Sequence, residues 1–139
     1  MVKKKKEFAK CILSPEIEQY QDLQVFEFKG KDTRGYDFSV QLSPVEAIPL
    51  MKEKPQAVDA DRVKMYFGGD PENMRDIGTE IEISLGKEPE IYKIDSATMT
   101  YIPRGMLHQH RVLQKPEKLS WLLSFTLPPK YVEPDEPKE

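Results

Sequence analysis

This chain of 139 residues has one cysteine, two histidines and no long apolar run, and each of these shortages excludes a class of protein. Cys11 alone cannot form an intrachain disulfide, so we expect a reduced, cytoplasmic chain rather than a secreted scaffold. The apolar stretch from Cys11 to Leu13 is too short for a signal peptide, and no segment is long enough to span a membrane. We therefore expect no association with a membrane.

Charge and motifs exclude further classes. The net charge is only −3, and the single basic run, Lys3 to Lys6, has no aromatic platform beside it. We interpret this run as a solvated tail and expect no nucleic acid partner. The sequence also contains no Ser-His-Asp order, no phosphate-binding glycine loop and no paired-cysteine metal motif. Hydrolase, nucleotide-binding and zinc-finger functions therefore have no feature to rest on.

What the chain does contain is a period-two alternation of apolar residues from Leu23 to Leu127, interrupted by Gly, Pro and Asp. This pattern predicts many short strands, so we expect an all-β domain that forms a sandwich or a closed barrel. The segment from Val45 to Met51 could be a further strand or a loop. The expected strands run from Leu23 to Phe28, Tyr36 to Leu42, Arg62 to Phe67, Thr79 to Leu85, Glu90 to Ile94, Thr98 to Ile102, Leu107 to Leu113 and Leu119 to Leu127.

The two ends differ from this central region. Ser14 and Pro15 could cap a short helix from Glu16 to Leu23, and Gly30 to Gly35 has the composition of a polar hairpin loop. We therefore divide the chain into an N-terminal tail with a possible helix (1–22), a barrel (23–127) and a proline-rich C-terminal tail (128–139).

The segment from Tyr101 to His108 breaks a strand at Pro103 and Gly105 and restarts one at the histidine. Such a turn would deliver an imidazole to the mouth of a barrel. The spacing Pro-x-Gly-x-x-His resembles the second motif of the cupins. The resemblance implies a double-stranded β-helix, or jelly-roll, barrel with a lumen, and a homodimer, because cupins often pair.

The same resemblance implies that the metal site usual in cupins is lost. Counting back from Gly69 puts Gln56, Val58 and Arg62 at the three ligand positions of the first cupin motif, and none of them is a typical metal ligand. We therefore expect no cofactor.

A divalent metal nevertheless stays open as the alternative. His108 and His110 lie two apart on an expected strand and so face the same way. They could share one ion, with Asp59, Asp61 or a glutamate as the third ligand. The chain would then be an enzyme resembling cupin isomerases or dioxygenases.

The replacement residues indicate a different chemistry. Gln56 and Arg62 would project into the lumen beside His108, with Tyr101 as a further candidate ligand-binding residue. A guanidinium in a partly apolar cavity favours an anionic partner such as a carboxylate. We therefore expect a small polar or anionic ligand. Alternatively, Arg62 pairs internally with Glu80, Glu82 or Asp61, or lies at an exposed rim.

The remaining patterns describe faces of strands. We expect Trp121, Leu123, Phe125 and Leu127, and separately Met99 with Tyr101, to belong to the core. Ile81, Ile83 and Leu85 form another buried stripe, with Glu80 and Glu82 on its solvated side. The third functional hypothesis is a non-catalytic assembly protein that pairs through an edge strand or exchanges its C-terminal segment. The sequence leaves open whether the chain is an enzyme.

Overall fold

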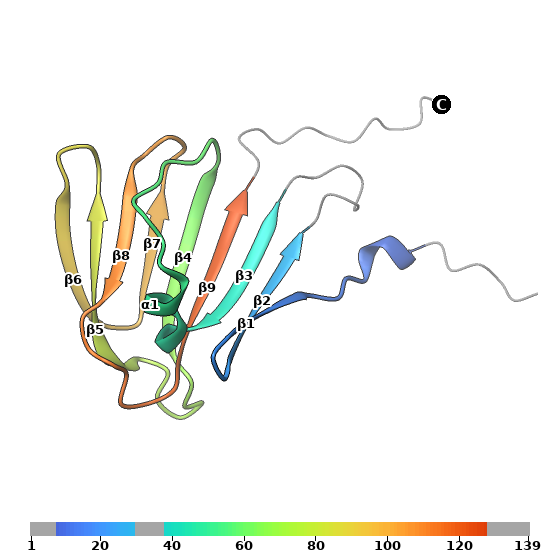
Figure 1. The fold of residues 1–139 in the computed structure, drawn as a ribbon, viewed down its shortest axis with the longest axis horizontal. Coiled ribbons are helices and arrows are strands. Elements are labelled where there is room, and N and C mark those ends of the chain that lie inside the picture. Colours follow the sequence, from blue (N-terminus) through green and yellow to red (C-terminus); the bar gives the residue numbers. More distant parts are fainter. Residues whose placement is uncertain (1–7, 30–37, 128–139) are drawn as a thin grey trace, which may run out of the picture.

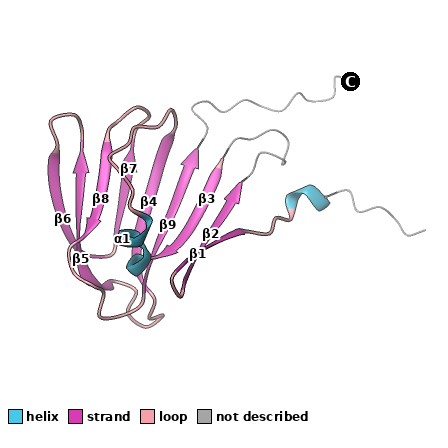
Figure 2. Ribbon diagram, viewed as in Figure 1, coloured by secondary structure: helices cyan, strands magenta, loops and turns pink. Residues whose placement is uncertain are grey.

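The computed structural model describes residues 8–29 and 38–127, and their secondary structure is dominated by strands, as expected (Figure 1, Figure 2). The strands form two antiparallel sheets, one six-stranded in the order β1-β2-β3-β9-β4-β7 and one three-stranded in the order β6-β5-β8. The expected hairpin loop at Gly30 to Gly35, the basic run and the C-terminal tail lie outside the described residues. The strands are β1 (Glu16–Tyr20), β2 (Leu23–Lys29), β3 (Ser39–Pro44), β4 (Asp61–Gly68), β5 (Asp76–Leu85), β6 (Glu90–Ser96), β7 (Thr98–Ile102), β8 (His108–Val112) and β9 (Ser120–Leu127).

The predicted helix from Glu16 to Leu23 is wrong. These residues form β1 and the start of β2, which pair antiparallel around a tight turn where Gln21 adopts a positive φ of 56°. The local capping signal of Ser14 and Pro15 is outweighed because Ile17 gains a partner across the ladder in Phe26.

The segment from Val45 to Met51 is neither a strand nor a plain loop. It forms a 3₁₀ turn, η2 (Val45–Ala47), followed by one helical turn, α1 (Ile48–Met51). Pro49 favours this outcome because proline cannot donate to a strand ladder but fits the first turn of a helix. The helix α1 packs against β8, and η2 packs against β9 and β2. A further 3₁₀ turn, η1 (Ala9–Cys11), precedes β1, and no helix of the described residues has the length and apolar character to cross a membrane.

The apolar core lies between the two sheets, at one end of the barrel. Ile81 and Ile83 of β5 are buried, as expected, and Leu85 packs against them while partly exposed. Each such side chain contributes roughly 1.5–3 kcal/mol when it leaves water. The buried cluster consists of Val45, Ile48, Tyr66, Ile77, Ile81, Ile83 and Leu122.

The prediction that the apolar stripe of β9 belongs to the core is wrong. Leu122 is buried at 2% exposure, whereas Leu127 on the alternate stripe is 42% exposed, and Met99 and Tyr101 of β7 are 64% and 54% exposed. The alternation of a strand determines which residues share a face, but it does not determine which face is inside. We refer to the apolar side as the outer face, and its residues in β2, β3, β9, β4 and β7 are Phe26, Phe28, Val40, Leu42, Trp121, Leu123, Phe125, Val63, Met65, Phe67, Met99 and Tyr101.

Candidate ligand-binding site

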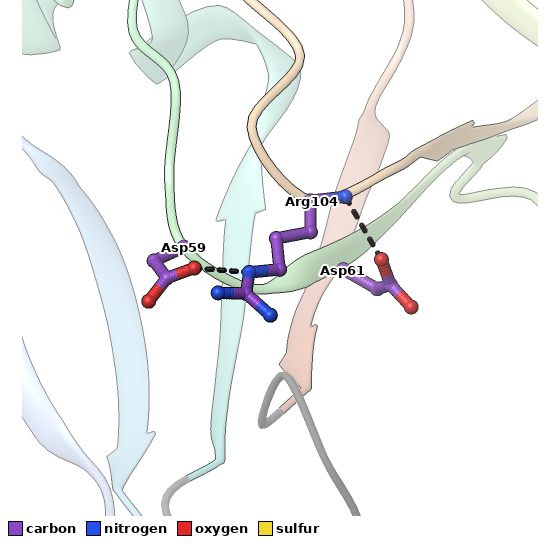
Figure 3. Close-up of polar contacts among 3 residues, drawn as sticks. All are labelled: Asp59, Asp61 and Arg104. Atoms are coloured by element: carbon purple, nitrogen blue, oxygen red, sulfur yellow. Dashed lines mark hydrogen bonds and ion pairs between the residues drawn. The ribbon is translucent and has the colours of Figure 1, made fainter.

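A tight turn before β8 positions the first histidine. Gly105 has a φ of +80°, and the Met106 amide donates to the Pro103 carbonyl at 3.1 Å, which are the features of a type II turn. The backbone amide of Arg104 donates to Asp61 at 2.9 Å, and its side chain pairs with Asp59 (Figure 3). The two aspartates therefore hold this turn, and their oxygens are not directed at a histidine as the metal hypothesis required.

His108 is buried at 3% exposure and is fixed on both sides of its ring. Its Nδ1 lies 3.0 Å from the Met106 carbonyl oxygen, so Nδ1 carries the proton and donates it. The lone pair of Nε2 then accepts from Nη1 of Arg62 at 3.1 Å. Burial, together with nearby positive charge from Lys64 and Arg62, lowers the pKa of His108, and the ring is neutral at pH 7.

Arg62 is held by this imidazole and by Thr126, whose Oγ1 accepts from Nε at 3.1 Å. Two of the acidic residues considered as its alternatives are engaged elsewhere, since Glu82 contacts Arg111 at 3.3 Å and Asp61 binds the turn. Glu80 makes no ion pair with Arg62 within the described residues. Within the described part of the chain, two of the five guanidinium N–H groups have partners, which leaves three for a ligand.

The structure brings together three of the predicted site residues and separates the fourth. Gln56 exchanges two backbone hydrogen bonds with His108, at 3.0 and 2.9 Å, and His108 contacts Arg62. Gln56 lies before β4, which begins at Asp61, and it reaches the site through this isolated bridge to His108. Tyr101 lies on the outer face, where interaction with Asp61 raises the pKa of its hydroxyl, and it does not line the lumen.

His110 is equally constrained. Its Nδ1 accepts from the Tyr66 hydroxyl at 2.7 Å, and its Nε2 lies 3.2 Å from Oε2 of Glu53. The second contact falls short of a directed hydrogen bond, yet at this distance the N–H dipole still stabilises the carboxylate. This imidazole, followed by the charges of Lys64 and Arg62, lowers the pKa of Glu53 to about 2, while burial lowers the pKa of His110 and raises that of Tyr66.

Lys64 is the site residue that sequence reasoning missed and that matters most. It follows Arg62 on the inner side of β4, opposite Ser124 of β9, and is only 5% exposed. No hydrogen-bond or ion-pair partner for its amine is present among residues 8–29 and 38–127. Burial lowers the pKa of Lys64 to about 8, although Glu53 opposes the change. In the sequence, Arg62, Lys64 and Tyr66 alternate with apolar residues, and this alternation could have indicated that Lys64 shares the lumen-facing side of the strand with Arg62.

A polar cavity of about 340 Å³ lies between strands of the six-stranded sheet and residues 53–56. Arg62 and Lys64 form part of its wall. The imidazole of His108 does not line the cavity but contacts it indirectly, through its hydrogen bond with Arg62. The volume lies within the range of small-molecule sites, roughly 300–1,000 Å³. The cavity is lined by Glu27, Ser39, Gln41, Glu53, Lys54, Pro55, Gln56, Arg62, Lys64, Ser124 and Thr126.

The residues of this site fit a divalent metal ion poorly. Among the described residues there is no group of three or more His, Cys, Asp or Glu side chains that could hold an ion. In addition, both nitrogens of His108 and both nitrogens of His110 already face a partner, and for His108 Nε2 that partner is the guanidinium of Arg62. The metal role of the two histidines stays a prediction.

Comparison with known proteins supports the fold and extends no further. No protein-family model and no curated protein sequence matches the chain. Vicilin from Corylus avellana (hazelnut) is similar in structure, with 14% identity and a TM-score of 0.52 over 88% of this chain and 33% of vicilin. The Schizosaccharomyces pombe Cnp3 cupin domain has 11% identity and a TM-score of 0.47, and the alignment covers 81% of this chain and 68% of the Cnp3 domain.

Hydroxypropylphosphonic acid epoxidase from S. wedmorenis, solved in complex with fosfomycin, shows 12% identity and a TM-score of 0.49 over 81% of this chain and 55% of the epoxidase. The chain thus spans about half the length of the epoxidase and a third of that of vicilin. Similarity at such low identity concerns the fold alone. Its two antiparallel sheets and the similarity to vicilin give this chain the fold of the cupins, the double-stranded β-helix or jelly-roll barrel.

Proposed function

We propose that this cupin barrel binds a small anionic molecule, with a carboxylate as the recognised group, in the cavity beside Arg62 and Lys64. The observation that carries the proposal is the Lys64 side chain, which is only 5% exposed and lines the cavity, while its amine has no partner among the described residues. Removing an ammonium group from water costs several kcal/mol unless an opposite charge offsets it. A bound anion would supply that charge.

The rest of the cavity supports the same ligand class. Arg62 offers three further N–H donors in a planar fork that matches a carboxylate, and Ser124 and Thr126 add hydroxyl groups to the wall. Glu27 and Glu53 line the same cavity, so two negative charges oppose a ligand that carries several. A small monoanion therefore fits better than a polyanion.

Ligand-dependent stabilisation tests this proposal. Melting temperatures are measured with a panel of small carboxylates, for the wild type, for Lys64→Met, and for Lys93→Met on the exposed strand β6 as the matched control. We expect at least one carboxylate to raise the melting temperature of the wild type and of the control but not of Lys64→Met, because only a ligand bound to the native state stabilises it. Equal responses in all three proteins would contradict the proposal.

The metal-dependent enzyme remains the alternative, and the metal content of the purified protein distinguishes it. Stoichiometric iron, manganese, nickel or zinc that disappears in His108→Ala would favour an isomerase or dioxygenase and would count against anion binding as the primary role. This measurement requires no knowledge of the ligand.

A second candidate function, assembly, is favoured by the outer face. We infer that this face binds a second copy of the chain and so forms the homodimer expected from the sequence. The twelve residues that define it are all uncharged, and the one carboxylate on the same side of β4, Asp61, lies at the end of the strand beside Tyr101, so two copies can meet across a two-fold axis with little like-charge repulsion. A groove of about 600 Å³ continues the face, with Phe26, Leu42 and Trp121 in its wall.

The size of the outer face is adequate for a stable dimer. Five strands about 4.8 Å apart and about six residues long cover roughly 500 Å² in projection. Side-chain relief and the groove enlarge this area toward the roughly 800 Å² per partner of a standard interface. An apolar patch of roughly 500 Å² is at the upper end of what a monomer exposes, and patches of this size often mark an interaction site.

Sedimentation of the wild type, of Phe125→Glu on the outer face, and of Tyr92→Glu on β6 tests the dimer. Tyr92 is 49% exposed and provides a matched aromatic outside the face. We expect dimers for the wild type and Tyr92→Glu and a folded monomer for Phe125→Glu, because an unpaired carboxylate would be buried at the interface. A monomeric wild type at micromolar concentration would overturn this inference.

A further inference from the structure

We propose that Lys64 is a nucleophile that forms an imine with a small 2-oxo monocarboxylic acid whose carboxylate is held by Arg62. This inference rests on the proposed function, since it requires that the cavity bind a carboxylate. It goes further by assigning a reaction to the amine and a class to the ligand.

The placement of the two side chains carries the inference. Arg62 and Lys64 are two residues apart on β4 and therefore face the same cavity with their Cα atoms about 7 Å apart. Both side chains are long, so a carboxylate on the guanidinium leaves the adjacent carbon within reach of the amine. Ser124 lies directly opposite Lys64 on β9, and its small side chain leaves room for the amine to approach.

The amine is also available for reaction. Within the described residues it has no hydrogen-bond or ion-pair partner that would hold it as an ammonium. Burial lowers the pKa of Lys64 to about 8; Glu53 opposes this and the charge of Arg62 adds to it. About half of the amine is then neutral at pH 8, whereas an ordinary lysine is almost entirely protonated there.

The reaction balances without a further reagent. The neutral amine adds to the 2-oxo carbon and forms a C–N bond, which gives a carbinolamine. The C–O bond of the carbinolamine then breaks, and its oxygen leaves as water. The two hydrogens of this water balance the two hydrogens that the amine nitrogen loses. The product is an imine, R–N=C, with no change in the number of electrons and no oxidant or reductant.

The acidic residues of the cavity restrict the ligand. Glu53 remains ionised because its pKa is lowered to about 2, and Glu27 lines the same wall. A second carboxylate on the ligand would meet these charges at close range. The geometry therefore favours 2-oxo acids with one carboxylate, such as glyoxylate and pyruvate, over dicarboxylates.

Reductive trapping tests the inference. The full chain is incubated at pH 8 with glyoxylate and sodium cyanoborohydride, which reduces an imine to a stable carboxymethyl amine, and the rate of modification of each lysine is followed by peptide mass spectrometry. We expect Lys64 to be modified at least about 10-fold faster than Lys93, because a larger fraction of its amine is neutral. Arg62→Gln should reduce this difference, since the carboxylate would lose its partner.

A second variant separates failure of this inference from failure of the proposed function. Lys64→Arg keeps the positive charge and a similar length, so it should still be stabilised by pyruvate but should not be trapped at position 64. If pyruvate stabilises the wild type while Lys64 reacts no faster than Lys93, the imine is overturned and anion binding stands. If neither trapping nor stabilisation by any carboxylate of the panel is seen, both proposals are overturned. Fast trapping that is indifferent to Arg62→Gln overturns the assigned ligand class.

Discussion

In most antiparallel sheets the apolar face is buried and the polar face is solvated. In the six-stranded sheet of this chain the more apolar face is the outer one. Here the inner face changes character along its length: β4 presents Tyr66, Lys64 and then Arg62. Leu122 lies opposite Tyr66, Ser124 opposite Lys64 and Thr126 opposite Arg62, so one end of the lumen is apolar and the other polar. The outer face is apolar along β2, β3, β9, β4 and β7, with Asp61 beside Tyr101 at its edge.

This contrast shows how one sheet can serve two purposes. The apolar end of the lumen stabilises the fold through contact with the three-stranded sheet, while the polar end holds charges that a ligand can satisfy. The apolar residues that a barrel would ordinarily use to fill its lumen are on the outside, where they require a different partner. Four substitutions break or sharpen this comparison.

The largest effect is expected for Leu122→Ala, with its sequence neighbour Leu123→Ala as the matched control. Leu122 is 2% exposed within the core, so its truncation should lower the free energy of unfolding by about 3 kcal/mol. Leu123 points to the outer face and should cost less than half as much in the monomer. Urea unfolding followed by circular dichroism measures both, and equal losses would contradict the assignment of the two faces.

The next largest effect is expected for Lys64→Met, which should stabilise the chain by about 2 kcal/mol at pH 7 because it removes a buried charge while keeping the volume. The pKa of Lys64 is about 8 in the folded chain and 10.5 ordinarily. The folded state therefore binds this proton less tightly, and wild-type stability falls as the pH decreases from about 10.5 to about 8.

The advantage of Lys64→Met should accordingly be greatest below pH 8 and should disappear toward pH 10.5. Urea unfolding of both proteins at a series of pH values measures this difference, and titration of other groups cancels in the comparison. A constant advantage across the range would show that the lysine is not buried as described. The same variant should lose the ligand, so stability and binding would change in opposite directions.

A smaller effect is expected for Tyr66→Phe, which removes the hydroxyl that donates to His110 at 2.7 Å. The cost should be about 1–2 kcal/mol, because Nδ1 of a buried imidazole loses its donor. Tyr92→Phe on exposed β6 is the control and should have no measurable effect on urea unfolding. A neutral Tyr66→Phe would mean that water replaces the hydroxyl in the lumen.

The smallest effect is expected for Arg104→Ala, outside the barrel. Its ion pair with Asp59 joins side chains that are 57% and 76% exposed, and such pairs contribute at most about 1 kcal/mol. The backbone amide of residue 104 would still donate to Asp61. We expect a change within about 0.5 kcal/mol in thermal unfolding. If Arg104→Ala lowered the free energy of unfolding as much as Tyr66→Phe does, polar contacts on the exterior would stabilise the fold as much as those in the lumen, contrary to this prediction.

The strands from β2 to β9 and the turn at Pro103 could be predicted because their signals are local, whereas β1 was mistaken for a helix. Strand β7 spans Thr98–Ile102 as expected, and Gly105 adopts the positive φ that its position in the turn requires. The proximity of Arg62 to His108 also followed from the resemblance to the cupins. These features depend on alternation and turn chemistry, which a sequence displays directly.

The orientation of the sheet and the contribution of Glu53 could not be predicted in the same way. Alternation grouped Trp121 with Leu123 but could not show that this group faces outward, because that depends on what the opposite sheet covers. Glu53 follows α1 and reaches His110 only through the packing of α1 on β8. Nothing near Glu53 in the sequence indicates this contact.

The separation of the faces also distributes the rare residue types of the chain. Its only tryptophan, Trp121, lies on the outer face, and both of its histidines lie in the lumen. Intrinsic fluorescence excited at the indole therefore reports on events at the outer face, while the imidazole proton resonances in a one-dimensional NMR spectrum report on the lumen. The unlabelled, unmodified protein thus carries separate probes for association and for ligand binding.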